Sequence, residues 1–147
     1  MLYAVPATDV QVWLLQKEKD APDSPALLLS WLAELLGHPP EVLRTDAGKP
    51  YLANSDLQFN FSHSRKWFAL SWHIGLEPVG VDIEDLGRRP SFAALAERYF
   101  HPAEKAQWLA ADASESAATL FQIWTRKEAV LKAHRLGLRL QLNTLDT

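Results

Sequence analysis

Apolar and polar positions in the first half of the chain follow the two-residue period of strands that bury one face. The clearest case is 57–62, where Leu57, Phe59 and Phe61 fall on one side. Residues 67–72 are its expected hairpin partner, joined through the polar turn 64–66. Strands are predicted at 10–15, 42–44, 57–62, 67–72 and 79–83. A buried helix is expected between the first two, with Ser24 as N-cap and a stop at Gly37.

From Ser91 onward the apolar residues recur at helical spacing instead. Helices are predicted at 92–100, 103–111 and 115–136, with Pro102 opening the second and Gly137 closing the third. Residues 138–145 alternate again and predict a last strand. Antiparallel strands followed by helices indicate the α+β class.

Composition narrows the functional classes without selecting one. The 147 residues suffice for a single unit with a real core, and the formal net charge of −3 argues against a duplex nucleic-acid binder. A local basic pocket for a phosphate ligand remains compatible with that charge. The chain has no Cys, so disulfides and thiolate chemistry are excluded. No apolar run reaches the ~18 residues of a membrane span, and residues 1–10 lack a basic signal region, so we expect a cytoplasmic protein.

The expected strand at 79–84 carries two carboxylates on one face. Strand geometry directs Val79, Val81 and Ile83 to one side and Gly80, Asp82 and Glu84 to the other. Two carboxylates so close repel each other unless a cation lies between them, and a hard divalent ion with oxygen ligands would fit. A strand with a solvated outer face explains the same pattern, and both interpretations stay open from the residues alone.

A second acidic position lies inside an apolar stripe of the predicted helix 115–136. Glu128 shares a helix face with Trp124 and Leu131, and a carboxylate there needs a partner. Lys132 follows four residues later, in the favourable order for an ion pair. The pair is either a plain helix ion pair or a metal ligand or base beside a phosphate-binding lysine.

The third candidate stretch is Asn60-Phe61-Ser62-His63-Ser64, at the end of the strand 57–62. Hydroxyl groups and an imidazole at a strand end can hold a phosphate, and they equally serve ordinary turns. A hydrolase is not indicated, because Ser62 does not lie in a Gly-x-Ser-x-Gly turn and no third member of a triad is present.

Taken together, these stretches resemble the 4′-phosphopantetheinyl transferase superfamily, in particular its surfactin-synthetase-activating type. The resemblance covers roughly residues 40–145. Its motifs are Gly48-Lys49-Pro50-Tyr51, the 59–64 stretch Phe-Asn-Phe-Ser-His-Ser, Gly80-Val81-Asp82-Ile83-Glu84, the 124–133 stretch Trp-Thr-Arg-Lys-Glu-Ala-Val-Leu-Lys-Ala, and Gly137-Leu138.

The resemblance implies a Mg²⁺-dependent transfer of phosphopantetheine from coenzyme A to a serine of an acyl or peptidyl carrier protein, with release of 3′,5′-ADP. It implies that Asp82, Glu84 and Glu128 bind Mg²⁺, with Glu128 also taking the serine proton. Lys132 would meet the charge that develops on the phosphates. Lys49, Ser62 and His63 would contact the nucleotide end of coenzyme A, and Glu104 matches a further acidic position. The alternative is a non-catalytic module that binds carrier proteins or coenzyme A.

The resemblance also implies a fold of two pseudo-symmetric α+β halves within one catalytic unit, the first at about 1–88 and the second at about 89–147. The chain departs from the family pattern because residues 25–37 contain no Arg or Lys. It also ends soon after the second-half helix. We therefore expect an incomplete or naturally short second half, or self-association through the apolar face of the last predicted strand, formed by Leu138, Leu140 and Leu142.

Overall fold

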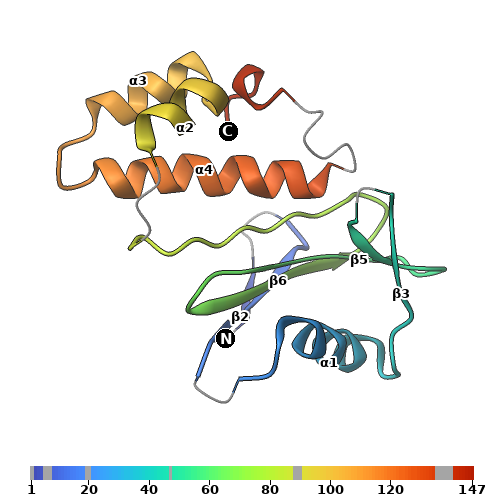
Figure 1. Cartoon of the computed structure of the whole chain (residues 1–147). Coiled ribbons are helices and arrows are strands. Elements are labelled where there is room, and N and C mark those ends of the chain that lie inside the picture. Colours follow the sequence, from blue (N-terminus) through green and yellow to red (C-terminus); the bar gives the residue numbers. More distant parts are fainter. Residues whose placement is uncertain (1, 5–7, 19–20, 47, 88–90, 135–140) are drawn as a thin grey trace.

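A computed structural model describes residues 2–4, 8–18, 21–46, 48–87, 91–134 and 141–147 (Figure 1). The strands are β1 (Leu2–Ala4), β2 (Gln11–Gln16), β3 (Val42–Arg44), β4 (Pro50–Leu52), β5 (Leu57–His63) and β6 (Trp67–Ile74). The helices are α1 (Ser24–Leu36), α2 (Phe92–Tyr99), α3 (Pro102–Ala110), α4 (Ser116–Ala133) and the short 3-10 helix η2 (Leu142–Thr144). The predicted α+β class is confirmed.

Four of the strands form one antiparallel sheet in the order β1-β2-β6-β5, and β3 pairs with β4 in a separate ribbon. The predicted hairpin is confirmed, with Leu57 opposite Ile74 at one end and His63 opposite Phe68 at the other. The second strand of the hairpin is two residues longer than the alternation indicated. Its other edge pairs with β2 along the whole length of β2.

Helix α1 covers one face of this sheet. It begins one residue earlier than predicted: Asp23, and not Ser24, is the N-cap, because Asp23 Oδ1 accepts a hydrogen bond of 2.8 Å from the amide of Ala26. The predicted stop is confirmed, since Gly37 adopts the left-handed conformation with φ of 72°.

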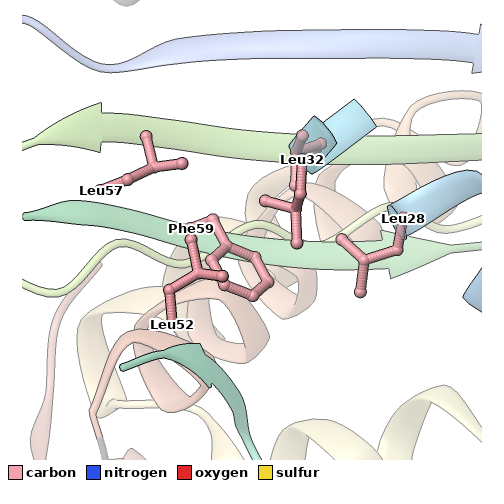
Figure 2. Packing of buried hydrophobic residues seen from close by; sticks show 6 residues of the cluster. Leu28, Leu32, Leu52, Leu57 and Phe59 are labelled. Carbon is pink, nitrogen blue, oxygen red and sulfur yellow. The ribbon is translucent and has the colours of Figure 1, made fainter. Parts of the chain in front are cut away.

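Leu28 and Leu32 of α1 pack against Leu57 and Phe59 of β5, with Leu52 of the ribbon beside them (Figure 2). Because strand side chains alternate, the odd positions of β5 face this core. The even positions, including Asn60 and Ser62, face the opposite side, and both are buried. That buried polar face is where the candidate site lies.

Helices α2, α3 and α4 form a second packed region with its own core of Ala96, Phe100, Leu120 and Ile123. Figure 1 shows α4 facing the side of the sheet opposite α1. Helix α4 spans Ser116–Ala133, shorter than the predicted 115–136, and His134 lies past its end. The division into two similar halves near residue 88 stays a prediction.

The predicted strand at 79–83 is wrong. Residues 79–87, here called the acidic segment, belong to neither sheet and end in a turn at Leu86 and Gly87. They run between α4 and the sheet (Figure 1). The alternation indicated a strand because an extended segment with one apolar side has the same pattern. Here Val79 is buried and Gly80 lies against α4.

The predicted strand at 138–145 is also wrong where the structure describes it. Residues 138–140 lie outside the described residues, while Leu142–Thr144 forms η2 and Leu142 is buried. The cause is a long-range contact: the ammonium group of Lys127 donates hydrogen bonds to the carbonyls of Leu142 and Leu145, at 2.7 and 2.6 Å. Leu142 is therefore not on the exposed strand face that was expected to drive self-association.

Candidate active site

A cavity of about 850 Å³ opens between the end of β5, the acidic segment and α4. Its lining includes Lys17, Ser62, His63, Arg65, Asp82, Glu84, Trp124, Glu128 and Lys132. Six of the seven predicted site residues are in this set, although they come from three separate parts of the chain. Lys49 is the exception.

Asp82, Lys132 and Ser62 form a closely connected group at the cavity wall. Lys132 Nζ lies 2.5 Å from Asp82 Oδ1 and 2.9 Å from Ser62 Oγ, and Ser62 Oγ donates to Asp82 Oδ1 at 3.0 Å. The Asp82 side chain is only 7% exposed, so its charge needs this pairing. Its second oxygen, Oδ2, is buried and makes no hydrogen bond to the described residues.

Glu128 lies across the cavity on α4, one helical turn before Lys132. Burial raises the pKa of Glu128 above its ordinary value, and the negative charges of Asp82 and Glu84 raise it further, while Lys132 opposes them. Glu128 is thus close enough to Asp82 and to Glu84 to be repelled by both. The three carboxylates line one cavity, as expected from the sequence.

His63 and Lys17 form the more basic side of the cavity. Burial and the nearby charges of Lys17 and Lys132 hold the pKa of His63 below 6.5, although a hydrogen bond involving the backbone of Ser64 works against them. These surroundings therefore favour the neutral imidazole of His63. Lys17 Nζ donates to the carbonyl of Ser64 at 2.6 Å and lies 4.4 Å from the centre of the Phe68 ring.

Gly80 allows the acidic segment to approach α4. A Cβ atom at Gly80 would lie 1.9 Å from the carbonyl oxygen of Ala129 and 2.7 Å from the nitrogen of Ala133. These two helix residues directly follow Glu128 and Lys132. The close backbone contact therefore sets the distance between the two groups of charged residues.

Two other residues of the predicted chemistry lie elsewhere. Lys49 Nζ donates to the carbonyl of Ala133, near the end of α4, at 3.1 Å and lies 3.5 Å from the carbonyl of Val79. It lines a separate cavity of about 260 Å³ beside the β3–β4 ribbon. Glu104 is 1% exposed and forms a buried ion pair of 2.7 Å with Lys127, so its contacts are structural.

Several lining residues were not predicted from the sequence. Lys17 precedes α1 and reaches the cavity only because β2 pairs with β6. Arg65 lies in the hairpin turn, and its amide donates to Asp85 Oδ2 at 2.8 Å. Asn60, which belongs to the predicted stretch 60–64, is not among the residues that line this cavity, and its Oδ1 accepts a hydrogen bond of 2.9 Å from the amide of Val81.

No group of three or more His, Cys, Asp or Glu side chains is arranged to hold a metal ion among the residues that the structure describes. The donor chemistry nevertheless suits a hard cation, because carboxylate oxygens from two elements line the cavity. The buried Asp82 Oδ2 is the clearest individual sign, since it makes no hydrogen bond to the described residues. No described helix has the length and apolar character that crossing a membrane requires.

The site has the composition of a phosphoryl-transfer centre: acidic residues facing a lysine, with basic groups at the cavity edge. A family model described as the 4′-phosphopantetheinyl transferase superfamily matches residues 78–147, which include the acidic segment and α4. The chain is 33% identical over 100 residues to the 4′-phosphopantetheinyl transferase Sfp of Bacillus subtilis (strain 168), covering 67% of this chain and 43% of that protein.

Two further relatives match over longer stretches. The 4′-phosphopantetheinyl transferase gsp of Aneurinibacillus migulanus is 33% identical over 122 residues, which is 80% of this chain and 49% of that protein. The 4′-phosphopantetheinyl transferase AcpT of Salmonella typhimurium is 36% identical over 125 residues, 80% of this chain and 64% of that protein. The chain thus spans between 43% and 64% of the length of these relatives. It belongs to the 4′-phosphopantetheinyl transferase superfamily.

Proposed function

We propose that the protein transfers 4′-phosphopantetheine from coenzyme A to a serine of an acyl or peptidyl carrier protein. The observation that carries this proposal is the shared cavity: Asp82 and Glu84 from the acidic segment face Glu128 and Lys132 from α4. The names of the matched relatives support the reaction class. A non-catalytic binding module is not favoured.

Asp82, Glu84 and Glu128 would hold Mg²⁺ in this proposal. The support is their carboxylate chemistry, their common cavity and the buried Asp82 Oδ2 that makes no hydrogen bond to the described residues. A bound Mg²⁺ would supply neutralisation of charge on the pyrophosphate of coenzyme A. Lys132, now paired with Asp82, would become available to phosphate oxygens once Asp82 is neutralised by another partner.

Coenzyme A would enter with its nucleotide end toward His63. Ser62 and His63 lie at the end of β5 beside Lys17, which adds a positive charge that the sequence did not assign. A phosphate near His63 would favour the protonated imidazole and so raise its lowered pKa. The expected contact of Lys49 with coenzyme A stays a prediction. Among the predicted contacts it has the least structural support, because this side chain lies outside the main cavity.

In the reaction, the hydroxyl oxygen of the carrier serine would attack the phosphorus that bears the pantetheine arm. The new serine–phosphorus bond would form as the bond from that phosphorus to the bridging oxygen breaks, and 3′,5′-ADP would leave. Glu128 would accept the serine proton. Lys132 would stabilise the charge on the leaving phosphate.

The test is incubation with an apo-carrier protein, coenzyme A and Mg²⁺, followed by mass spectrometry for the phosphopantetheine increment on the carrier. Glu128→Gln should abolish the increment. Glu115→Gln is the matched control, because Glu115 is exposed beside the start of α4 and its side chain makes no capping hydrogen bond. Absence of the increment with several carrier proteins would contradict the proposed activity.

A cytoplasmic location and a carrier protein as partner complete the proposal. Self-association is a separate question, and light scattering after size-exclusion chromatography would measure it directly. Leu142, one of the three residues on which self-association was predicted, is buried against the helical region. This weakens the expectation of an exposed apolar edge.

A further inference from the structure

The acidic segment has no strand partner among the described residues, although it must hold two carboxylates in place. Extended backbone normally satisfies its amide groups through a ladder of hydrogen bonds. Here side chains contribute contacts instead. The carbonyl of Val79 lies 3.5 Å from Lys49 Nζ, and Asp85 accepts from the amide of Arg65.

Next to Asp82 in the sequence, the backbone amide of Val81 is bound by Asn60. The Asn60 side-chain oxygen Oδ1 accepts a hydrogen bond of 2.9 Å from the amide of Val81. Asn60 is only 5% exposed, on the even face of β5 that also carries Ser62. Its side chain thus takes the place of a strand carbonyl at the residue immediately before Asp82.

We infer that Asn60 is a positioning residue for the acidic site. It fixes the backbone at Val81, while Ser62, two residues further along β5, hydrogen-bonds to the side chain of Asp82. The two bonds together set both the position and the rotation of the Asp82 carboxylate relative to Lys132. This inference rests on the proposed function for its catalytic consequence and on the structure alone for the Asn60–Val81 bond.

The physical basis is that residues supporting metal-binding or catalytic groups control how well those groups are aligned. Losing such a partner typically lowers metal affinity by about 10–100-fold. A loss of stability alone would instead lower the activity without changing the Mg²⁺ concentration at half-maximal rate. The two effects are therefore separable.

Ser71 provides a matched control. It lies directly opposite Asn60 on β6, so its side chain is on the same face of the sheet. It is 1% exposed, and its hydroxyl makes no hydrogen bond to the described residues. Ser71→Ala therefore alters a buried polar side chain at the same depth without removing a hydrogen bond to the acidic segment.

The experiment compares Asn60→Ala, the isosteric Asn60→Leu, Asn60→Asp and Ser71→Ala in the full chain. Hydrogen exchange of the Val81 amide is followed by NMR, and the rate is measured against Mg²⁺ and coenzyme A concentrations. We expect Asn60→Ala and Asn60→Leu to speed exchange at Val81 by about tenfold, which corresponds to about 1.4 kcal/mol. The Mg²⁺ concentration at half-maximal rate should rise by about tenfold, with the KM for coenzyme A unchanged. Asn60→Asp keeps an acceptor oxygen and should preserve protection at Val81, as should Ser71→Ala.

Unchanged exchange at Val81 in both Asn60→Ala and Asn60→Leu would overturn the inference even if the enzyme is active. Equal acceleration in Ser71→Ala would also overturn it, because the effect would then be general loosening. If the wild-type chain transfers nothing but Val81 loses protection only in Asn60→Ala and Asn60→Leu, the positioning role stands and the proposed function fails.

Discussion

Alanine at Gly80 is the most direct perturbation of the distance between the acidic segment and α4. The added Cβ would lie 1.9 Å from the carbonyl oxygen of Ala129, whereas a carbon–oxygen contact needs about 3.3 Å. The segment and the helix would have to separate by about 1.4 Å. The obstacle is helix backbone, which cannot rotate away as a flexible side chain could.

The expected loss of activity follows from what flanks this contact. Glu128 and Lys132 immediately precede the two helix residues that the new methyl group meets, and Asp82 lies two residues beyond Gly80. A separation of this size would lengthen the 2.5 Å Lys132–Asp82 ion pair by a similar amount. Misplacement by about 1 Å can cost about 100-fold in rate, so we expect transfer to fall by about that factor.

Gly80→Ala should reduce the free energy of unfolding by less than it raises the free-energy barrier of transfer. Overpacking typically destabilises by about 1–3 kcal/mol, which for this size of chain lowers the Tm by several degrees. The assays are a thermal melt and carrier-protein modification, measured below the Tm of both proteins. Gly87→Ala is the stability control, because a Cβ there has no heavy atom within 4 Å. A Gly80→Ala variant with wild-type Tm and wild-type transfer would refute the close packing.

Three other outcomes are expected. Burial would raise the pKa of Glu104, but hydrogen bonds from Lys127, Thr147 and the His101 backbone outweigh it and lower that pKa below 4.5; the resulting stability is complete above about pH 4.5 and is lost as pH falls through the lower folded-state pKa. Thermal melts between about pH 3 and about pH 7 should show this loss of stability at low pH. Glu104→Gln should make the Tm less dependent on pH and destabilise the protein by about 3–5 kcal/mol, since Lys127 would lose its ion-pair partner. His63→Ala should weaken binding of coenzyme A more than binding of 3′-dephospho-coenzyme A; equal losses in calorimetry would show that His63 does not recognise the 3′-phosphate. Lys132→Ala should lower kcat more than it raises KM, and the reverse in steady-state kinetics would make Lys132 only a binding group.

The sequence predicted the elements whose pattern is local. The β5–β6 hairpin follows from alternation around a polar turn, and the start of α3 follows from Pro102. The capping box formed by His101 and Glu104 is seen only in the structure. The error at the start of α1 is of one residue, because Asp23 and Ser24 are both good N-caps and only the hydrogen bond to Ala26 distinguishes them.

The elements that were predicted wrongly depend on contacts distant in sequence. Alternation at 79–83 does not reveal that the amide of Val81 is bound by Asn60 and that Gly80 lies against α4. Residues 142–144 form η2, where Lys127 donates hydrogen bonds to the carbonyls of Leu142 and Leu145. In the candidate site, the motifs predicted which carboxylates would share a cavity, but Lys17 enters it through sheet pairing that no local pattern encodes.

Helix α4 packs into the helical core on one side and lines the cavity on another, and this decides how substitutions along it should be interpreted. Lys127 and Glu128 are adjacent, yet successive helical residues point in directions about 100° apart. Lys127 is fully buried against Glu104 and the carbonyls of the C-terminal segment, on the face that also buries Leu120 and Ile123. Glu128 faces the cavity instead.

Removing the Lys127 charge would leave Glu104 buried without its ion-pair partner and destabilise the helical region, so activity would fall in parallel with the folded fraction. Removing the Glu128 carboxylate would relieve its repulsion with Asp82 and Glu84, so activity would fall without a matching loss of stability. Lys127 and Glu128 are neighbours in one motif, but Lys127 supports the reaction through folding and Glu128 through the site itself. Measuring stability and rate on the same variants distinguishes these two roles.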